Sequence, residues 1–171
     1  AFGDSGIASK RRLHPADGVI ELDEIDLRDL RLDEIRDQVV LVDRPEILAG
    51  TVLENLRMGR RELTLTSMRQ MLQTVGLNRL LATVPEGMST LLPTGGGWLP
   101  ESDAIRITLA RALLGRPRLL ILDQILDKLD LEQETELLEA LFDPDAPWTL
   151  LIVSQRPEIL NRCGRLIVSG D

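Results

Sequence analysis

The residue best placed to do chemistry in this sequence is Asp123, which follows the unbroken apolar run Leu119–Leu122. An apolar run of this length is typical of a strand that is buried on both faces of a parallel sheet. A carboxylate at the carboxyl end of such a strand lies where open α/β sheets bind their ligands. The pattern therefore predicts a site at Asp123 that is suited to a phosphate-bound metal ion.

The elements around this strand follow from hydrophobic periodicity and from helix-ending residues. Residues 104–114 predict a buried helix, which Gly115-Arg116-Pro117 is expected to end. Thr51 and Thr66 are expected to cap further helices, with Met68, Met71 and Leu72 on the buried face of the second. Short helices are predicted at 78–83, 131–141 and 157–161, and other strands at 19–22, 39–42, 148–153 and 165–169.

Strands and helices alternate in the second half, which predicts an α/β fold with a mainly parallel sheet. The mainly helical block 51–103 separates two strand regions, so we interpret it as an inserted α-helical subdomain. Its last part, 84–103, is rich in Gly and Pro and is expected to be a long, functional or mobile loop.

Composition excludes several classes of function. The chain has 171 residues, enough for one domain with its own core, and a formal net charge of −8 that disfavours nucleic acid as a partner. His14 is the only histidine, which removes most zinc sites and His-based catalysis. Cys163 is alone, so an internal disulfide is excluded and a reducing environment is expected. The sequence has neither a signal peptide nor an apolar run of the ~20 residues that span a membrane, so any membrane anchor must lie elsewhere.

The order of these segments resembles the nucleotide-binding domain of ATP-binding-cassette (ABC) transporters of the exporter type. ITLARALLGRPRLLILD is similar to the helix after the signature loop and the Walker B strand. DKLD lies at the D-loop position, and WTLLIVSQRPEIL resembles the switch strand and loop. The other matching segments are ADGVIELDEIDLRDLRLDEIRDQVVLV, AGTVLENL and VGLNRLLATVPEGMSTLL.

The resemblance implies a P-loop NTPase-like fold with a helix-flanked, mainly parallel sheet and the helical subdomain at 51–103. Residues 1–171 would form one such domain, incomplete at its N-terminus, because the first strands and the adenine-stacking aromatic residue would precede Ala1. The family's phosphate-binding loop, GxxxxGK[ST], cradles phosphates with backbone N–H groups and a lysine. Here the nucleotide-binding segment Gly3, Asp4, Ser5 and Gly6 resembles its beginning, but Gly-Lys-Ser/Thr does not follow. Either the rest of the loop is absent, or a stretch between Gly6 and Ile7 is missing from this sequence; the family-like segments on both sides favour the second explanation.

The resemblance assigns Asp123 to holding Mg²⁺ and places glutamines at two catalytic positions. Gln124 occupies the position of the glutamate that polarises the attacking water, and an amide cannot accept a proton from it. Gln155 occupies the position of the switch histidine and can donate a hydrogen bond without carrying positive charge. Hydrolysis is therefore expected to be weak.

The remaining family loops are also altered. Asp43 stands where the glutamine loop has its nucleotide-site glutamine, and Asp130 ends the D-loop. The signature LSGGQ, whose glycines bring backbone N–H groups to the partner's ATP, is replaced here. Two carboxylates at that point are expected to repel a triphosphate. The replacement is Leu99, Pro100, Glu101, Ser102 and Asp103.

These observations predict an ATP-binding domain of an ABC exporter that couples ATP binding and hydrolysis to transmembrane transport, with degenerate motifs. ATP and Mg²⁺ would be its cofactors. Its partners would be a second nucleotide-binding domain, in a homo- or heterodimer, and a transmembrane domain outside this chain. That domain would hold it at the cytoplasmic face of the (inner) membrane.

Two alternatives remain open. The chain could be a non-catalytic regulatory or scaffolding subunit that uses the fold for dimerisation, or a competent ATPase with unusual loop chemistry.

Overall fold

The computed structural model describes most of the chain from residue 38 onward, and the chain divides into two units, 1–35 and 36–171. In the first unit, β1 (Glu21–Leu22) pairs antiparallel with β2 (Ile25–Asp26). The strand predicted at 19–22 is therefore confirmed for its last two residues. The predicted phosphate-loop residues 3–6 lie outside the described part. The described residues are 19, 21, 22, 25, 26, 29, 38–131 and 134–168.

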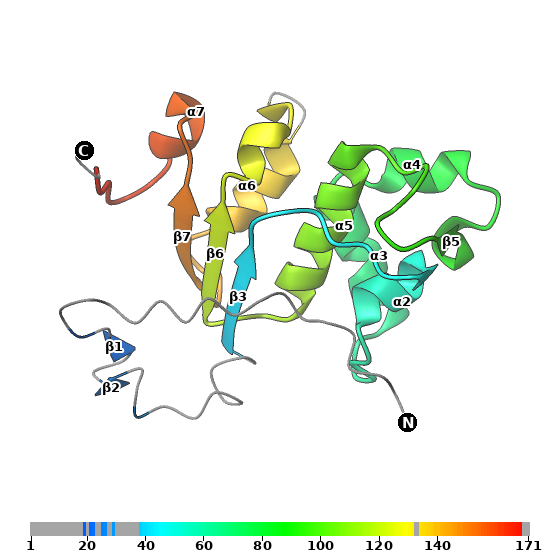
Figure 1. Cartoon of the computed structure of the whole chain (residues 1–171), viewed down its shortest axis with the longest axis horizontal. Coiled ribbons are helices and arrows are strands. Elements are labelled where there is room, and N and C mark those ends of the chain that lie inside the picture. Colours follow the sequence, from blue (N-terminus) through cyan, green and yellow to red (C-terminus); the bar gives the residue numbers. More distant parts are fainter. Residues whose placement is uncertain are drawn as a thin grey trace. The chain divides into compact units, whose positions relative to one another are not determined.

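The second unit is built on a three-stranded parallel sheet with the order β3-β6-β7. Its strands are β3 (Val39–Val42), β6 (Leu119–Asp123) and β7 (Thr149–Val153). The registers join Val42 to Leu122 and Leu122 to Ile152. All three strands run in the same direction, so their carboxyl ends meet at one edge (Figure 1). The prediction of parallel strands at these positions is confirmed.

The two faces of this sheet differ in burial. Leu120 and Leu122 of β6 are fully buried, whereas the alternate position Ile121 is only partly buried. On the same face as Ile121, its register partners Leu41 and Leu151 are 58% and 47% exposed. The expectation that the strand at Leu119–Leu122 is buried on both faces therefore holds for one face only, since the other is partly buried. An apolar run shows that a strand can be buried, but it does not show that a second layer covers it.

A helical segment lies between β3 and β6 in sequence. Its N-terminal part begins with β4 (Gly50–Thr51), which leads directly into α2 (Val52–Arg57). Thr51 caps α2 as predicted. α3 (Leu65–Thr74) buries Met68 and Leu72 as predicted, but its cap is Thr64 instead of Thr66. α4 (Asn78–Thr83) has the predicted bounds.

The segment 84–103 is more regular than the loop that was predicted. It contains the 3₁₀ helix η1 (Gly87–Ser89) and β5 (Leu91–Leu92), which pairs antiparallel with β4. It also contains the first turn of α5 (Glu101–Leu114), which begins earlier than the predicted start at residue 104. Acidic residues are favourable in the first turn of a helix, which explains this extension.

The C-terminal part returns the chain to the sheet. After β6 come the 3₁₀ helix η2 (Leu126–Lys128) and α6 (Thr135–Leu141), which starts later than predicted. α7 (Pro157–Leu160) follows β7. The described residues 161–168 form no strand, which corrects the strand predicted at 165–169. Ile167 and Val168 are 76% and 81% exposed there, and apolar residues with strand propensity need a neighbouring strand to form one.

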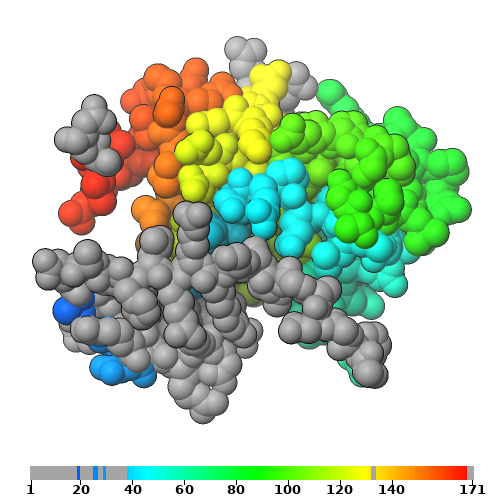
Figure 2. Space-filling view, viewed as in Figure 1, coloured from blue at the N-terminus to red at the C-terminus, as the bar shows by residue number. Residues whose placement is uncertain are grey.

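Helix α5 is the centre of the core. It contacts α2, α3 and β3, and Ile105, Ile107 and Leu109 are fully buried in it. One contiguous cluster of buried apolar side chains extends from these helices to Leu120 and Leu122 of the sheet. In the space-filling view the helical segment (cyan and green) and the β7–α7 region (orange) lie on opposite sides of this unit (Figure 2). Among the described helices, none is both long enough and apolar enough to cross a membrane.

Candidate functional site

The carboxyl edge of the sheet brings together four of the predicted site residues. Asp43 follows β3, Asp123 ends β6, and Gln155 comes two residues after the end of β7. The register pairs Asp123 with Val153, so the ends of β6 and β7 are adjacent. Asp123 is half-buried, whereas Asp43, Gln124 and Gln155 are exposed. This edge therefore presents carboxylate and amide groups to solvent.

The turn at Gln124 has an unusual backbone conformation. Its φ is +54°, in the left-handed region that non-glycine residues rarely adopt. Hydrogen bonds on both sides hold it there: its N–H donates to the carbonyl of Val153 at 2.9 Å, and its carbonyl accepts from the N–H of Asp127 at 3.2 Å. Strained residues that neighbours hold in this way often occur at functional sites. Periodicity in the sequence gave no signal of it.

Asp127 joins the segment after β6 to the segment after β7. One carboxylate oxygen accepts a short hydrogen bond from the Ser154 hydroxyl, and the other accepts from the Gln155 N–H at 3.3 Å. The guanidinium of Arg156 donates to the Leu129 carbonyl at 2.8 Å. Sequence spacing could not reveal these contacts, because the partners are separated by 27 or 28 residues.

The acidic residues of the altered signature segment are paired within the chain. Asp103 contacts the Arg106 guanidinium at 2.8 Å, and Glu101 lies 3.5 Å from the Lys128 ammonium. Arg106 also forms an ion pair with Glu134, whose side chain is 1% exposed. Burial by itself would lower the pKa of Arg106, but hydrogen bonds and charge attraction from Glu134 and Asp103 outweigh it and raise this pKa. The N-terminus of α5 is thus occupied by the chain's own carboxylates.

The structure also brings the signature segment next to the D-loop position. A pocket of about 750 Å³ is lined by Pro100, Ser102, Asp103 and Asp130, with Arg106 and Glu134. Leu99 differs from the rest of this segment because its side chain is 9% exposed and packs in the core. The predicted residues therefore form two groups, one at the carboxyl edge of the sheet and one around the start of α5.

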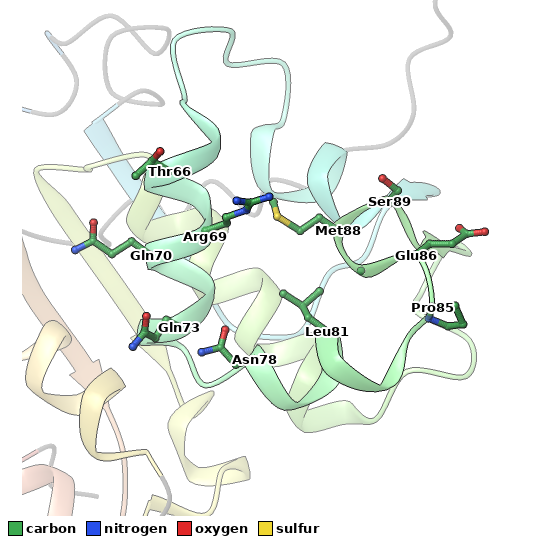
Figure 3. Close-up of a pocket in the computed structure, with 11 residues that line it drawn as sticks. Thr66, Arg69, Gln70, Gln73, Asn78, Leu81, Pro85, Glu86, Met88 and Ser89 are labelled. Carbon is green, nitrogen blue, oxygen red and sulfur yellow. The ribbon is translucent and has the colours of Figure 1, made fainter.

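A second pocket, of about 870 Å³, lies between α3, α4 and η1 and shares Gln73 and Asn78 with the pocket near the start of α5. Its lining is mixed polar and apolar, and Arg69 and Met88 point toward each other across it (Figure 3). None of the predicted site residues lines it. Its polar side chains come from Thr66, Arg69, Gln70, Gln73, Asn78, Glu86 and Ser89.

Within the described part of the chain, no three His, Cys, Asp or Glu residues cluster in a way that could hold a metal ion by themselves. Mg²⁺ at nucleotide sites is commonly held by one or two carboxylates together with substrate phosphates. Asp123 at the sheet edge is such a carboxylate, and Asp43 at the end of the neighbouring strand could be a second.

Comparisons with known proteins show which proteins the chain is similar to. No protein-family model matches the chain. P-glycoprotein 14 of Caenorhabditis elegans is 38% identical over 125 residues, which cover 72% of this chain and 9% of that protein. The mitochondrial potassium channel ATP-binding subunit of Homo sapiens is 31% identical over 173 residues, which cover 99% of this chain and 24% of that protein.

A solved structure has the same fold. The structure of a bacterial Atm1-family ABC exporter with ATP bound matches this chain with a TM-score of 0.76 and a sequence identity of 20%. The match covers 85% of this chain and 26% of that one. The helix-flanked parallel sheet of this chain thus has an ABC exporter-like α/β fold. The chain is a homologue of ABC transporters and their ATP-binding subunits, which confirms the resemblance seen in the sequence. It spans between 9% and 26% of the length of these proteins.

Proposed function

We propose that this chain is the ATP-binding domain of an ABC exporter, that it binds Mg²⁺-nucleotide at the carboxyl edge of its sheet, and that it hydrolyses ATP weakly or not at all. The observation that carries the proposal is the alignment of β3, β6 and β7, which sets Asp123 beside the segments that carry Asp43 and Gln155. The comparisons support a transporter-associated, ATP-binding role through the homologues.

The residues at this edge fit Mg²⁺ and a phosphate chain. When bound, Mg²⁺ would neutralise phosphate charge, and Asp123 would hold it directly or through water. Asp123 is half-buried and lies next to exposed groups, so a ligand has access to it. Asp43 would contribute a second oxygen ligand from the end of β3.

Two residues of the chain limit hydrolysis in this proposal. Gln124 orients water through its amide but cannot take up the proton of that water, which removes the general base. Gln155 donates a hydrogen bond at the terminal phosphate without supplying positive charge. Both changes weaken stabilisation of the transition state at this chain's own nucleotide.

The signature segment limits the partner's site in the same way. Glu101 and Asp103 lie in the first turn of α5, where they interact favourably with the helix dipole and with Lys128 and Arg106. A phosphate of the partner would have to displace or oppose these carboxylates. The site that this segment completes across a dimer would therefore be impaired.

The proposal extends to the organisation of the larger protein. Residues 51–103 would be the helical subdomain of a single domain over 1–171. A second nucleotide-binding domain would pair with it, and a transmembrane domain would hold it at the cytoplasmic face of the (inner) membrane. The Gly3–Gly6 segment would contribute to the phosphate loop.

One observation favours a second candidate function. Asp103 and Glu101, in the first turn of α5, are paired with Arg106 and Lys128 within the chain and place negative charge where a phosphate would bind. A non-catalytic regulatory or scaffolding subunit, which acts through dimerisation alone, would have this property. The two candidates differ in whether nucleotide binds.

Titration of the 171-residue chain with a fluorescent ATP analogue, with and without Mg²⁺, tests the proposal. Asp123→Asn removes the charge that would hold Mg²⁺, so it should weaken binding roughly 10–100-fold with Mg²⁺ and little without it. Asp145→Asn is the matched control, because Asp145 is exposed and lies in the turn between α6 and β7. Absence of binding by the parent chain at millimolar nucleotide would favour the scaffolding candidate.

A further inference from the structure

The two segments that carry Gln124 and Gln155 are held together by a closed set of contacts. Gln124 bonds to the Val153 carbonyl at 2.9 Å and accepts from the Asp127 N–H at 3.2 Å. Asp127 in turn accepts from the Ser154 hydroxyl and from the Gln155 N–H. These contacts join the segment after β6 to the segment after β7, and they fix the two glutamine positions relative to each other.

We propose that Asp127 is a positioning residue that sets Gln155 at the nucleotide edge, acting through Ser154 and the Gln155 backbone. This inference rests on the proposed function, since it assigns Gln155 to a bound nucleotide. Both carboxylate oxygens of Asp127 accept from the 154–155 segment, so the carboxylate holds that segment at two points. The Ser154 oxygen also accepts a hydrogen bond from the Arg156 N–H at 3.1 Å, so the hydrogen-bonded segment continues to Arg156.

The carboxylate is not needed to anchor its own segment. Leu126 in η2 and Leu129 directly after η2 are 1% and 3% exposed and fix this segment in the core. Asp127 itself is half-buried, and Gln155 is exposed. The contacts of Asp127 thus act mainly on the loop after β7, whose exposed residues would otherwise have little to order them.

A second contact joins the same loop to the η2 segment. The Arg156 guanidinium donates to the Leu129 carbonyl at 2.8 Å and lies 3.7 Å from Glu158. Arg156 keeps the loop near η2 when Asp127 is changed, so Asp127 variants should loosen the position of Gln155 without releasing the whole loop. Because the Arg156 contact remains in Asp127 variants, the effect of Asp127 on Gln155 can be measured by itself.

The first readout is amide hydrogen exchange of the nucleotide-free 171-residue chain. In Asp127→Asn, one carboxylate oxygen becomes an NH₂ donor, which cannot accept both hydrogen bonds. Exchange at Gln155 should become about tenfold faster, because hydrogen bonds to charged groups are stronger than neutral ones. Asp145→Asn should leave that exchange unchanged. Ser154→Ala removes only the hydrogen bond between the Ser154 hydroxyl and Asp127. This variant replaces Asp127→Asn in the experiment if Asp127→Asn does not fold.

The second readout is the preference for ATP over ADP, with Mg²⁺ present, in a double-mutant cycle. Gln155→Ala should reduce the preference, Asp127→Asn should reduce it as well, and the double variant should match Gln155→Ala, because Asp127 acts through Gln155. A merely structural role of Asp127 would instead add to the effect of Gln155→Ala and would overturn the inference. Unchanged Gln155 exchange in Asp127→Asn would also overturn it.

The two proposals fail in different ways. If the parent chain binds ATP in an Asp123-dependent manner but the cycle is additive, the positioning role fails alone. If the parent chain binds neither nucleotide, the proposed function fails and the role of Asp127 toward nucleotide fails with it, whatever the exchange rates show.

Discussion

Gln124 and Gln155 retain the hydrogen-bonding capacity of the side chains that the family carries at their positions, but they lack a proton acceptor and a positive charge. Both glutamines are exposed at the same sheet edge, next to the half-buried Asp123. In the proposed function, nucleotide binding depends on groups that this chain has, whereas ATP turnover depends on groups that are replaced by Gln124 and Gln155.

We predict that Gln124→Glu alone does not restore ATP turnover. The new carboxylate would supply a general base, but Gln155 and the acidic first turn of α5 would remain unable to stabilise transition-state charge. Steady-state phosphate release should stay at the parent level, measured beside an Asp123→Asn/Gln124→Glu variant as the background control. Robust hydrolysis after this single change would show that the other loops are competent.

The sequence predicted residues that the structure places together at the sheet edge, but not how they are linked. Asp123 could be found because an apolar run ends on it, and the family pattern then located Gln124 and Gln155. The positive φ of Gln124 and the contacts of Asp127 could not be found, because they depend on side chains that meet only when β6 and β7 lie side by side. Pairs that far apart in sequence leave no periodic signal.

At the scale of elements, helix caps decide where the helices begin. Thr64 has an extended backbone, and its hydroxyl accepts from the Ser67 N–H at 3.1 Å, so α3 starts at Leu65. Thr66 was predicted to have this role because both threonines precede the same buried face. The sequence fixes the face of a helix through Met68 and Leu72, but two nearby threonines are equally able to cap it.

We predict that Thr64→Ala lowers the free energy of unfolding by about 1 kcal/mol, because it leaves an N–H at the start of α3 without its acceptor. Thr66→Ala is the matched control and should have little effect, since Thr66 is exposed inside the first turn. Chemical denaturation of both variants measures the difference. A larger loss for Thr66→Ala would place the cap where the sequence suggested.

A second cap gives a pH-dependent prediction. The Glu54 carboxylate accepts from the Thr51 N–H at 2.7 Å and from the Thr51 hydroxyl at 3.0 Å. These hydrogen bonds, that of the backbone first, lower the pKa of Glu54 below its ordinary value of 4.5. A group whose pKa is lowered by folding stabilises the fold above its unfolded pKa, and this contribution is lost as pH falls through the folded pKa.

Thr51→Ala removes the hydroxyl that caps α2, and loss of this cap should lower the free energy of unfolding at neutral pH by about 1 kcal/mol. The backbone N–H of residue 51 remains, so the pKa of Glu54 should move only part of the way back up toward its ordinary value. The loss should become smaller at acidic pH, where Glu54 is protonated in both states. Denaturation at several pH values and an NMR titration of Glu54 check the two parts. An unchanged pKa of Glu54 in the variant would contradict the capping-box explanation.

Elements without a cap or a partner were the least predictable. Leu166, Ile167 and Val168 have strand-like side chains but are exposed and form no strand, because strand formation needs a neighbour that composition does not reveal. The exposure of Leu41 and Leu151 was unpredictable for a related reason, since composition does not reveal whether a second layer covers their face of the sheet. By contrast, α4 and β3 were predicted with their observed bounds, since turn residues flank both of them.

At the scale of the whole molecule, the framework of an ABC domain is combined with altered functional loops. The core from α5 to β6 is continuous and closely packed, and it holds the sheet edge in place. The altered loops are attached to this framework by ion pairs and hydrogen bonds of their own, such as Glu101 with Lys128 and Asp127 with Ser154. In this account the chain keeps an ordered nucleotide edge while its capacity for turnover is reduced.

The most direct test of this account is amide hydrogen exchange of the 171-residue chain with and without Mg²⁺-ATP, resolved along the sequence. The account predicts that the nucleotide slows exchange at the sheet edge, around Asp43, Asp123–Gln124 and Ser154–Gln155, and that Asp123→Asn abolishes this protection. Protection confined to the pocket between α3 and α4, or no protection at millimolar Mg²⁺-ATP, would contradict it.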